Sequence, residues 1–203
     1  MSPAPSEGSP AGSTPGDASG HCAPPHETPA GSDHRVWRLG ADVDTDQLAP
    51  GAYMKLPIEG IAPHCLEEVR PDFASSVRSG DVVAAGPNFG IGSSREQAAA
   101  ALLHLGVRAV IAPSFSGLFF RNAFNLGLLL LTCREAETLA EGETVRLDLQ
   151  QMQVCTQDGR RLACDPIPAF LIDMVEAGGL MNQLRQRLQT GRGATPELDL
   201  NPS

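Results

Sequence analysis

A glycine-rich loop with two serines and an arginine is the part of the sequence best suited to chemistry. Residues 86–97 read Gly-Pro-Asn-Phe-Gly-Ile-Gly-Ser-Ser-Arg-Glu-Gln and lie between an apolar run and an alanine-rich segment. Gly90 and Gly92 can take backbone conformations with positive φ and let a ligand approach the main chain. Free amides at a helix N-terminus attract anions, and arginine holds a carboxylate through paired hydrogen bonds. The loop therefore predicts an anion site around residues 93–95.

The same stretch also has a purely structural interpretation. Ser93 and Glu96 have the spacing of a capping box, in which the two side chains bind free amides of the first helical turn. The glycines, the second hydroxyl at Ser94 and the cation at Arg95 favour an anion site over a cap alone. No lysine follows Gly92 and the spacing Gly-x-Gly-x-x-Gly is absent, so a standard nucleotide loop is not indicated.

Composition limits the class of protein. The 203 residues, 41% of them hydrophobic, predict one ordinary domain with tails, and the net charge of −9 argues against a general nucleic-acid or anionic-membrane surface. The five cysteines form no Cys-x-x-Cys pair, which predicts free thiols in a reducing compartment and no cluster or zinc site. Neither a membrane span nor a secretory signal is recognisable, so we expect the cytoplasm.

Alternating apolar runs and helical patterns predict an α/β domain over residues 34–190, between tails at 1–33 and 191–203. The runs expected to form parallel strands and the helices between them are 81–85, 95–105, 109–112, 115–126 and 128–132. Residues 145–149 alternate, and 152–164 resemble a hairpin about an Asp-Gly turn, which adds antiparallel strands. A helical pair at 168–177 and 180–188 follows, so the sheet should be mixed and partly parallel.

The segment before the loop is polar and irregular. Asp42, Asp44 and Asp46 lack the central glycine and closing glutamate of a calcium loop, so we expect a solvated turn whose carboxylates cap amides or contribute to a site. In the loop at 49–57, Tyr53 and Lys55 could face a ligand. A short helix is expected at 58–69, and we expect 71–80 to return the chain to the surface.

With these elements placed, residues 37–188 resemble the 3-isopropylmalate dehydratase small-subunit family, the swivel domain of the aconitase superfamily. The motifs that carry the resemblance are Asp-Thr-Asp at 44–46, Asn-Phe-Gly-Ile-Gly-Ser-Ser-Arg-Glu at 88–96, Ala-Val-Ile-Ala-Pro-Ser-Phe at 109–115 and Arg-Asn-Ala at 121–123. The resemblance implies a three-layer β/β/α domain that closes over a separate large subunit holding a [4Fe-4S] cluster. It also implies that this chain itself binds no cofactor.

The resemblance further implies roles for individual residues. Ser93 is the base that removes a carbon-bound proton, and Gly90, Gly92 and Glu96 shape the loop and helix start around it. The residues expected to bind the 2-hydroxy di- or tricarboxylate substrate are Ser94, Arg95, Asp46, Tyr53 and Lys55. A serine hydroxyl can act as a base only where charge on its oxygen is stabilised, which helix-end amides and Arg95 would do in a closed site.

Several positions depart from the family pattern and leave the substrate open. The departures are Ile91, Gln97 and Ser116-Gly117. Lys55 could pair with an extra carboxylate, whereas an isopropyl group would prefer an apolar loop. The leading prediction is therefore 3-isopropylmalate dehydratase, which isomerises 2- and 3-isopropylmalate in leucine biosynthesis; the alternatives are homoaconitate hydratase, another 2-alkylmalate dehydratase or a non-catalytic anion-binding module.

Overall fold

The strands of the structure form one mixed sheet. The computed structural model describes residues 33–191, and within that range the sheet has seven strands in the order β4-β3-β2-β1-β5-β6-β7. Their bounds are β1 His34–Arg38, β2 Val82–Ala84, β3 Ala109–Ala112, β4 Leu129–Thr132, β5 Thr144–Asp148, β6 Gln153–Thr156 and β7 Arg161–Ala163. Strands β1 to β4 pair in parallel and β5 to β7 are antiparallel. The predicted α/β class with a mixed, partly parallel sheet is confirmed.

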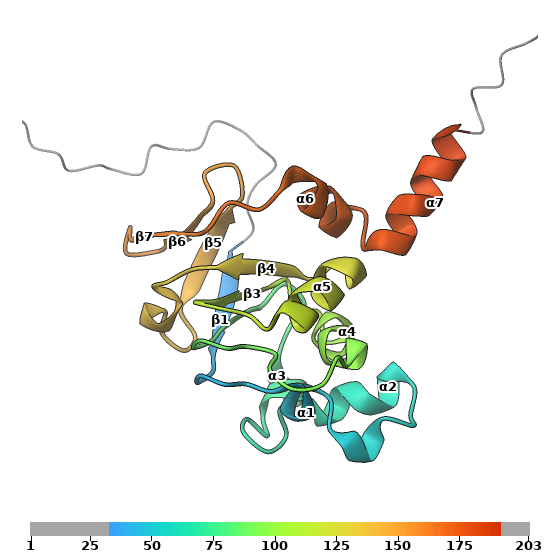
Figure 1. Ribbon diagram of the computed structural model, residues 1–203. Coiled ribbons are helices and arrows are strands. Elements are labelled where there is room, and N and C mark those ends of the chain that lie inside the picture. The colour runs from blue at the N-terminus through green and yellow to red at the C-terminus, as the bar shows by residue number, and fades with distance from the viewer. Residues whose placement is uncertain (1–32, 192–203) are drawn as a thin grey trace, which may run out of the picture.

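Strand β1 belongs to both halves of the sheet. Its first residues pair with β5 in antiparallel register, His34 opposite Val145, and its later residues pair with β2 in parallel register, Val36 opposite Val82. The sheet therefore curls where β1 passes from one half to the other. In Figure 1 the antiparallel strands lie on one side of the parallel strands, and helices α4 and α5 lie on the other. The order strand, strand, helix agrees with the implied β/β/α architecture.

The helices fall into long connections and short turns. Their bounds are α1 Thr45–Leu48, α2 Ile58–Ile61, α3 Phe73–Ser76, α4 Glu96–His104, α5 Gly117–Leu126, α6 Ala169–Glu176 and α7 Leu180–Gly191, with 3₁₀ turns η1 Gly51–Tyr53, η2 Ala62–His64 and η3 Ala136–Thr138. The long helices follow the predicted pattern. The tails predicted at 1–33 and 191–203 lie outside the described residues, except for Asp33 and Gly191.

The helix expected at 58–69 is wrong in its length, because α2 ends at Ile61. Pro63 lacks an amide hydrogen and Leu66 has a φ of +62°, and neither fits a helix interior. The loop before it, at 49–57, contains the short turn η1. Residues 71–80 run along the surface as expected, apart from Phe73 of α3, which is fully buried.

The parallel half of the sheet holds the core. All residues of β2 and β3 are buried, as their continuous apolar runs predict for strands covered on both faces. Ala98, Ala99 and Ala101 of α4 are also buried, and their small side chains let this helix pack closely on its neighbours. Leu118 of α5 is 44% exposed, whereas Phe119 and Ala123 of the same helix are buried. This packing fixes the start of α4 beside the carboxyl end of β2.

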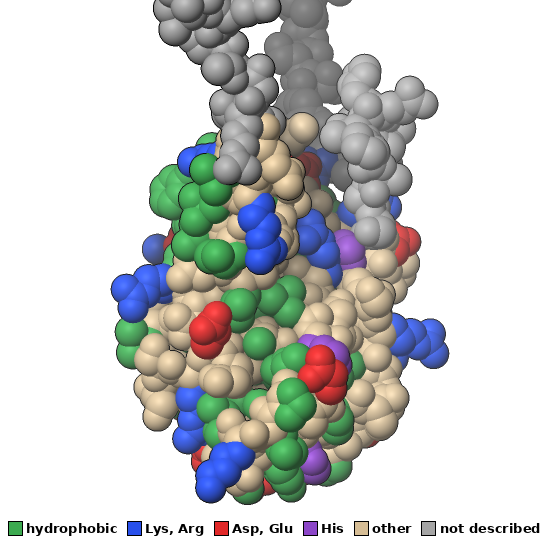
Figure 2. Space-filling view, turned by 90° about the vertical axis from the view of Figure 1, so that its right-hand side faces the viewer, with side chains coloured by type: hydrophobic (Ala, Val, Ile, Leu, Met, Phe, Trp, Pro, Cys, Tyr) green, Lys and Arg blue, Asp and Glu red, His purple; other side chains and the backbone are tan. Residues whose placement is uncertain are grey.

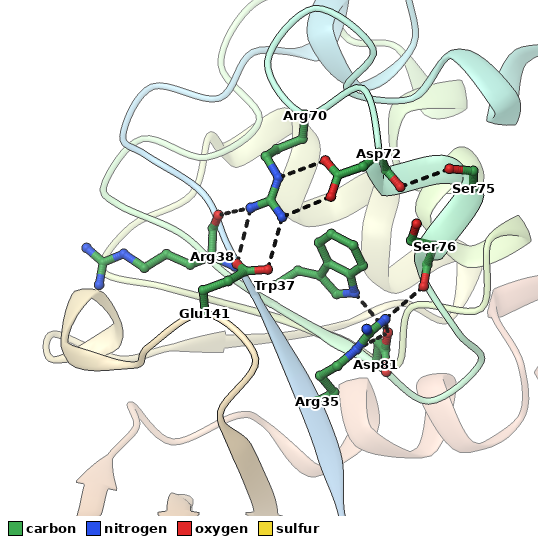
Figure 3. Close-up of polar contacts among 9 residues, drawn as sticks. All are labelled: Arg35, Trp37, Arg38, Arg70, Asp72, Ser75, Ser76, Asp81 and Glu141. Carbon is green, nitrogen blue, oxygen red and sulfur yellow. Dashed lines mark hydrogen bonds and ion pairs between the residues drawn. The ribbon is translucent and has the colours of Figure 1, made fainter.

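A buried carboxylate stabilises the amino end of β2 (Figure 3). Asp81 is 6% exposed and accepts hydrogen bonds from Arg35 Nη2 at 2.6 Å, Trp37 Nε1 at 2.8 Å and the Arg78 amide at 3.0 Å. The guanidinium carbons of Arg35 and Arg70 lie 4.7 Å and 4.9 Å from the Trp37 ring centroid. Burial raises the pKa of Asp81, but these donors outweigh it and the net pKa is lowered. The network joins β1 to β2 at the end of the sheet opposite the serine loop.

Asp81→Asn should lower the free energy of unfolding by about 2–3 kcal/mol at neutral pH. The reason is that the Arg35 guanidinium and the Trp37 indole lose a buried anionic acceptor. The pKa of Asp81 is lower in the folded protein than in the unfolded chain. Its stabilising effect is therefore fully present above the ordinary aspartate pKa of about 4, and it is lost as the pH falls through the pKa of Asp81 in the folded protein. Urea unfolding at pH 7 and at acid pH measures the difference. Asp72→Asn, at an exposed partner of Arg70, is the control; equal losses in the two variants at pH 7 would contradict the account.

Candidate functional site

The serine loop leaves the carboxyl end of β2 and is held by the main chain of two neighbouring segments. The Phe89 amide donates to Ser114 O at 3.1 Å, and the Gly90 amide donates to Val43 O at 2.7 Å. Gly90 has a φ of +76°, and a Cβ there would lie 2.2 Å from Phe119, so both its conformation and its position require glycine. The loop is therefore rigid where it approaches the serines.

Ser93 and Ser94 are exposed at the end of this rigid segment. Their hydroxyls and amides have no hydrogen-bond partner among residues 33–191, so they are available to a ligand. The structural alternative, a capping box between Ser93 and Glu96, does not form, because α4 begins at Glu96 without a side-chain cap. Arg95 takes the cap position in an extended conformation, with φ −84° and ψ 107°, which leaves Ser93 two residues ahead of the cap.

A capping box does occur one segment earlier. Asp44 Oδ1 accepts from the amides of Asp46 and Gln47 at 2.9 Å and 2.8 Å, and Gln47 Oε1 accepts from the Asp44 amide at 3.1 Å. The expectation that an aspartate of this turn caps backbone amides is confirmed. The box fixes α1, whose first residue, Thr45, donates its amide to Ile91 O at 2.8 Å. Helix α1 thus supports the serine loop from the side.

Arg95 extends from the loop to α1. Its Nη1 donates to the Asp46 carboxylate and to Ala49 O, the second bond at 3.0 Å, while Nε and Nη2 have no partner within the described part of the chain. Asp46 also accepts the Gly51 amide at 3.0 Å, and the hydrogen bond from Arg95 lowers the pKa of Asp46. Asp46 stays an anion at neutral pH and orients the guanidinium, which leaves one edge of Arg95 free for a carboxylate.

The residues expected to recognise the substrate lie on the turn that follows Asp46. Tyr53 stacks on His64 with ring centroids 3.5 Å apart and planes 10° from parallel, and His64 Nδ1 donates to Glu67 at 2.6 Å. Burial, followed by the charge of Glu67, raises the pKa of Tyr53. Lys55 is exposed, two residues beyond Tyr53. The stack joins the turns η1 and η2, and nothing in the sequence indicates that these two rings pair.

The arrangement brings together the parts of an anion site. Helix α4 contacts both α1 and α2, and α1 and α2 lie at the end of the molecule opposite α6 and α7 (Figure 1). These helices place the hydroxyls and amides of Ser93 and Ser94 on one exposed segment, next to the Arg95 guanidinium, of which only Nη1 is hydrogen-bonded within the described residues. Such a set can bind a carboxylate and stabilise negative charge on a serine oxygen. The face in Figure 2 carries hydrophobic side chains between scattered charges, without a broad patch of one sign.

The part of the chain that the structure describes contains neither a group of metal ligands nor a membrane-spanning helix. No three His, Cys, Asp or Glu side chains of residues 33–191 are grouped so that they could hold a metal ion. The cysteines in that range, Cys65, Cys133, Cys155 and Cys164, form no disulfide, and Cys22 lies outside it. None of the described helices is both long and apolar enough to cross a membrane.

Comparison with known proteins identifies the family. The model of the aconitase C-terminal domain matches residues 72–136. The 3-isopropylmalate dehydratase small subunit of Sulfurimonas denitrificans is 41% identical over 155 residues, which cover 75% of this chain and 93% of that protein. The methanogen homoaconitase small subunit of Methanothermobacter thermautotrophicus is 42% identical over 160 residues, 77% of this chain and 92% of that protein.

A solved structure agrees with these relatives. The crystal structure of 3-isopropylmalate dehydratase from Methanocaldococcus jannaschii superposes with a TM-score of 0.75 and 35% identity, over 80% of this chain and 98% of that one. The motifs at 44–46 and 88–96 lie side by side in the fold, joined by the bridge between Asp44 and Ile91. The chain belongs to the 3-isopropylmalate dehydratase small-subunit family of the aconitase superfamily, whose members are hydro-lyase subunits that work with a large subunit.

Proposed function

We propose that this chain completes the active site of a 3-isopropylmalate dehydratase, which interconverts 2- and 3-isopropylmalate by dehydration and rehydration in leucine biosynthesis. The observation that carries the proposal is the Ser93 hydroxyl, exposed and unpaired within the described residues beside Arg95. A buried or capped hydroxyl at this position would be unable to reach a substrate held by a second protein. The free thiols fit a reducing compartment such as the cytoplasm.

Each residue of the loop has a separate task in this reaction. The free edge of Arg95 binds a substrate carboxylate and orients the neighbouring carbon toward Ser93. Ser93 acts as an alkoxide, whose negative charge the amides at the start of α4 and Ser94 stabilise; it takes the proton from that carbon and becomes a neutral hydroxyl, while the charge passes to the substrate. In the reverse direction Ser93 returns the proton, and water adds at the adjacent carbon. These interactions strengthen when a partner excludes bulk water from the exposed loop.

The partner we propose is a large subunit that carries a [4Fe-4S] cluster. When bound, that cluster supplies a Lewis acid for the leaving hydroxyl, a task for which residues 33–191 offer no grouped ligands. The small subunit contributes the proton acceptor and the carboxylate clamp. Reconstitution tests the proposal: the two subunits together should isomerise isopropylmalate, and the isolated small subunit should be inactive. Turnover by the small subunit alone would contradict it.

A tricarboxylate such as homoaconitate is the second candidate substrate, and Lys55 is the observation that favours it. The side chain is exposed on the turn attached to Asp46, where a cation could bind a third carboxylate. The 42% identity to a homoaconitase small subunit is in the same range as the identity to isopropylmalate dehydratases.

Lys55→Met in the reconstituted enzyme decides between the two substrates. If isopropylmalate is the substrate, kcat/KM for it should change by less than about 3-fold, because its isopropyl group makes no ion pair. If homoaconitate is the substrate, the wild-type enzyme should prefer it and the variant should lose about 10²-fold in kcat/KM for it. Glu59→Gln, at an exposed position of α2, controls for a change of surface charge alone.

A further inference from the structure

Two cysteines that are distant in the sequence meet beside the sheet. Cys133 directly follows β4 and is 1% exposed, and Cys164 directly follows β7 and is half-buried. The residues next to them share a backbone hydrogen bond, from the Asp165 amide to Thr132 O at 2.8 Å. The ends of the two strands are thereby held together.

The backbone of each cysteine is also fixed by the sheet. The Cys133 amide donates to Ala112 O at 2.9 Å, and the Cys164 amide donates to Met152 O at 2.8 Å. Neither cysteine therefore lies on a freely moving loop. A contact between their side chains is a property of the folded sheet, present whether or not the partner subunit is bound.

The two side chains lie on backbone segments that the hydrogen bond from Asp165 to Thr132 joins, and they interact electrostatically. The interaction with Cys164 lowers the pKa of Cys133 to about 7, although burial opposes the shift. The interaction with Cys133, together with burial, raises the pKa of Cys164, whose thiol donates to Leu162 O at 3.9 Å. A thiolate on Cys133 next to a thiol on Cys164 is the ionisation state that disulfide chemistry requires.

We propose that Cys133 and Cys164 are an oxidation site that closes to a disulfide when the protein meets hydrogen peroxide. The Cys133 thiolate attacks one peroxide oxygen, the O–O bond breaks, and the departing hydroxide takes up the proton that Cys133 had released to solvent. The Cys164 sulfur then attacks the resulting sulfenic sulfur, and its proton leaves with the hydroxyl as water. Two thiols lose two electrons in total, and one peroxide becomes two waters.

The disulfide would link the end of β4 to the segment that leads from β7 into α6. Helices α6 and α7 pack on α5, and α5 leads into β4. The disulfide would therefore close a covalent loop over residues 133–164 at this edge of the domain. A cross-link between positions distant in sequence restricts the unfolded chain and raises the unfolding temperature. Cys133 lies at the carboxyl end of β4, two strands along the sheet from β2, whose carboxyl end leads into the serine loop.

The test uses the full-length reduced protein treated with hydrogen peroxide and digested without reductant. Mass spectrometry should find one cross-linked peptide pair containing Cys133 and Cys164, with two fewer thiols in a denaturing titration. The unfolding temperature should rise, and dithiothreitol should reverse all three changes. Cys164→Ser should abolish the cross-link and the rise in temperature, whereas the matched control Cys155→Ser should keep both.

Three outcomes would overturn the proposal. The first is a cross-link that joins either residue to Cys22, Cys65 or Cys155 instead. The second is oxidation of Cys133 or Cys164 to sulfinic acid without a cross-link, and the third is a rise in unfolding temperature that persists in Cys164→Ser. Peptide mapping of the wild-type chain decides the matter even if Cys164→Ser prevents folding.

Discussion

Replacing Ser93 by alanine should lower kcat of the reconstituted two-subunit enzyme by about 10³-fold, with little change in KM. The variant loses the only group that the account assigns to proton removal, and general base catalysis contributes about 10²–10⁴-fold. Because the hydroxyl is exposed and makes no hydrogen bond within the described residues, its removal should leave the free energy of unfolding unchanged to within about 0.5 kcal/mol. Steady-state kinetics and urea unfolding of the same preparation measure both.

Ser79→Ala is the matched control for this experiment. Ser79 is also exposed but lies before β2, at the end of the sheet opposite the serine loop. It should keep wild-type kcat. A loss in Ser93→Ala that is no larger than the loss in this control would assign the serine loop to binding without catalysis, as in the anion-binding alternative.

Arg95→Lys should lower kcat/KM by about 10²-fold, mainly through a higher KM. Lysine keeps the charge but lacks the planar pair of donors that holds a carboxylate at two points, and it cannot bind Asp46, Ala49 O and a substrate at once. An interaction made equally in the ground and transition states changes KM more than kcat.

Arg108→Lys, at an exposed position just before β3, serves as the control for Arg95→Lys. Arg108→Lys should leave kcat and KM unchanged. If the KM for isopropylmalate is unaltered in Arg95→Lys, the substrate carboxylates are bound by other residues. The proposal that Arg95 orients the substrate carbon toward Ser93 would then lose its support.

The parallel half of the fold is largely predictable from the sequence. Runs such as Ala109–Ala112 are apolar throughout, because both faces of these strands are covered, and Gly127 ends α5 with a φ of +93°. The short elements before β2 are not predictable in the same way. A four-residue helix such as α3 has too few residues to show a period, and it forms because Phe73 packs against Trp37, with ring centroids 5.1 Å apart.

The site was predictable in its residues but not in its contacts. Ser-x-x-Glu at Ser93 and Asp-x-x-Gln at Asp44 both match a capping box, and only the extended backbone at Arg95 decides that the second forms and the first does not. Local spacing cannot encode that difference. The bond from Arg95 to Asp46 joins positions 49 residues apart, so it depends on α1 packing beside α4, which only the folded chain defines.

The most direct test of the central claim is the exchange of the carbon-bound substrate hydrogen with deuterium from solvent water. In the reconstituted wild-type enzyme at equilibrium, the isopropylmalate proton removed in dehydration should exchange at a rate tied to turnover. With Ser93→Ala, the substrate should still bind to the complex, but this exchange should fall by about the same 10³-fold as kcat. Exchange at the wild-type rate in the variant would show that another group removes the proton, and would contradict the role of Ser93.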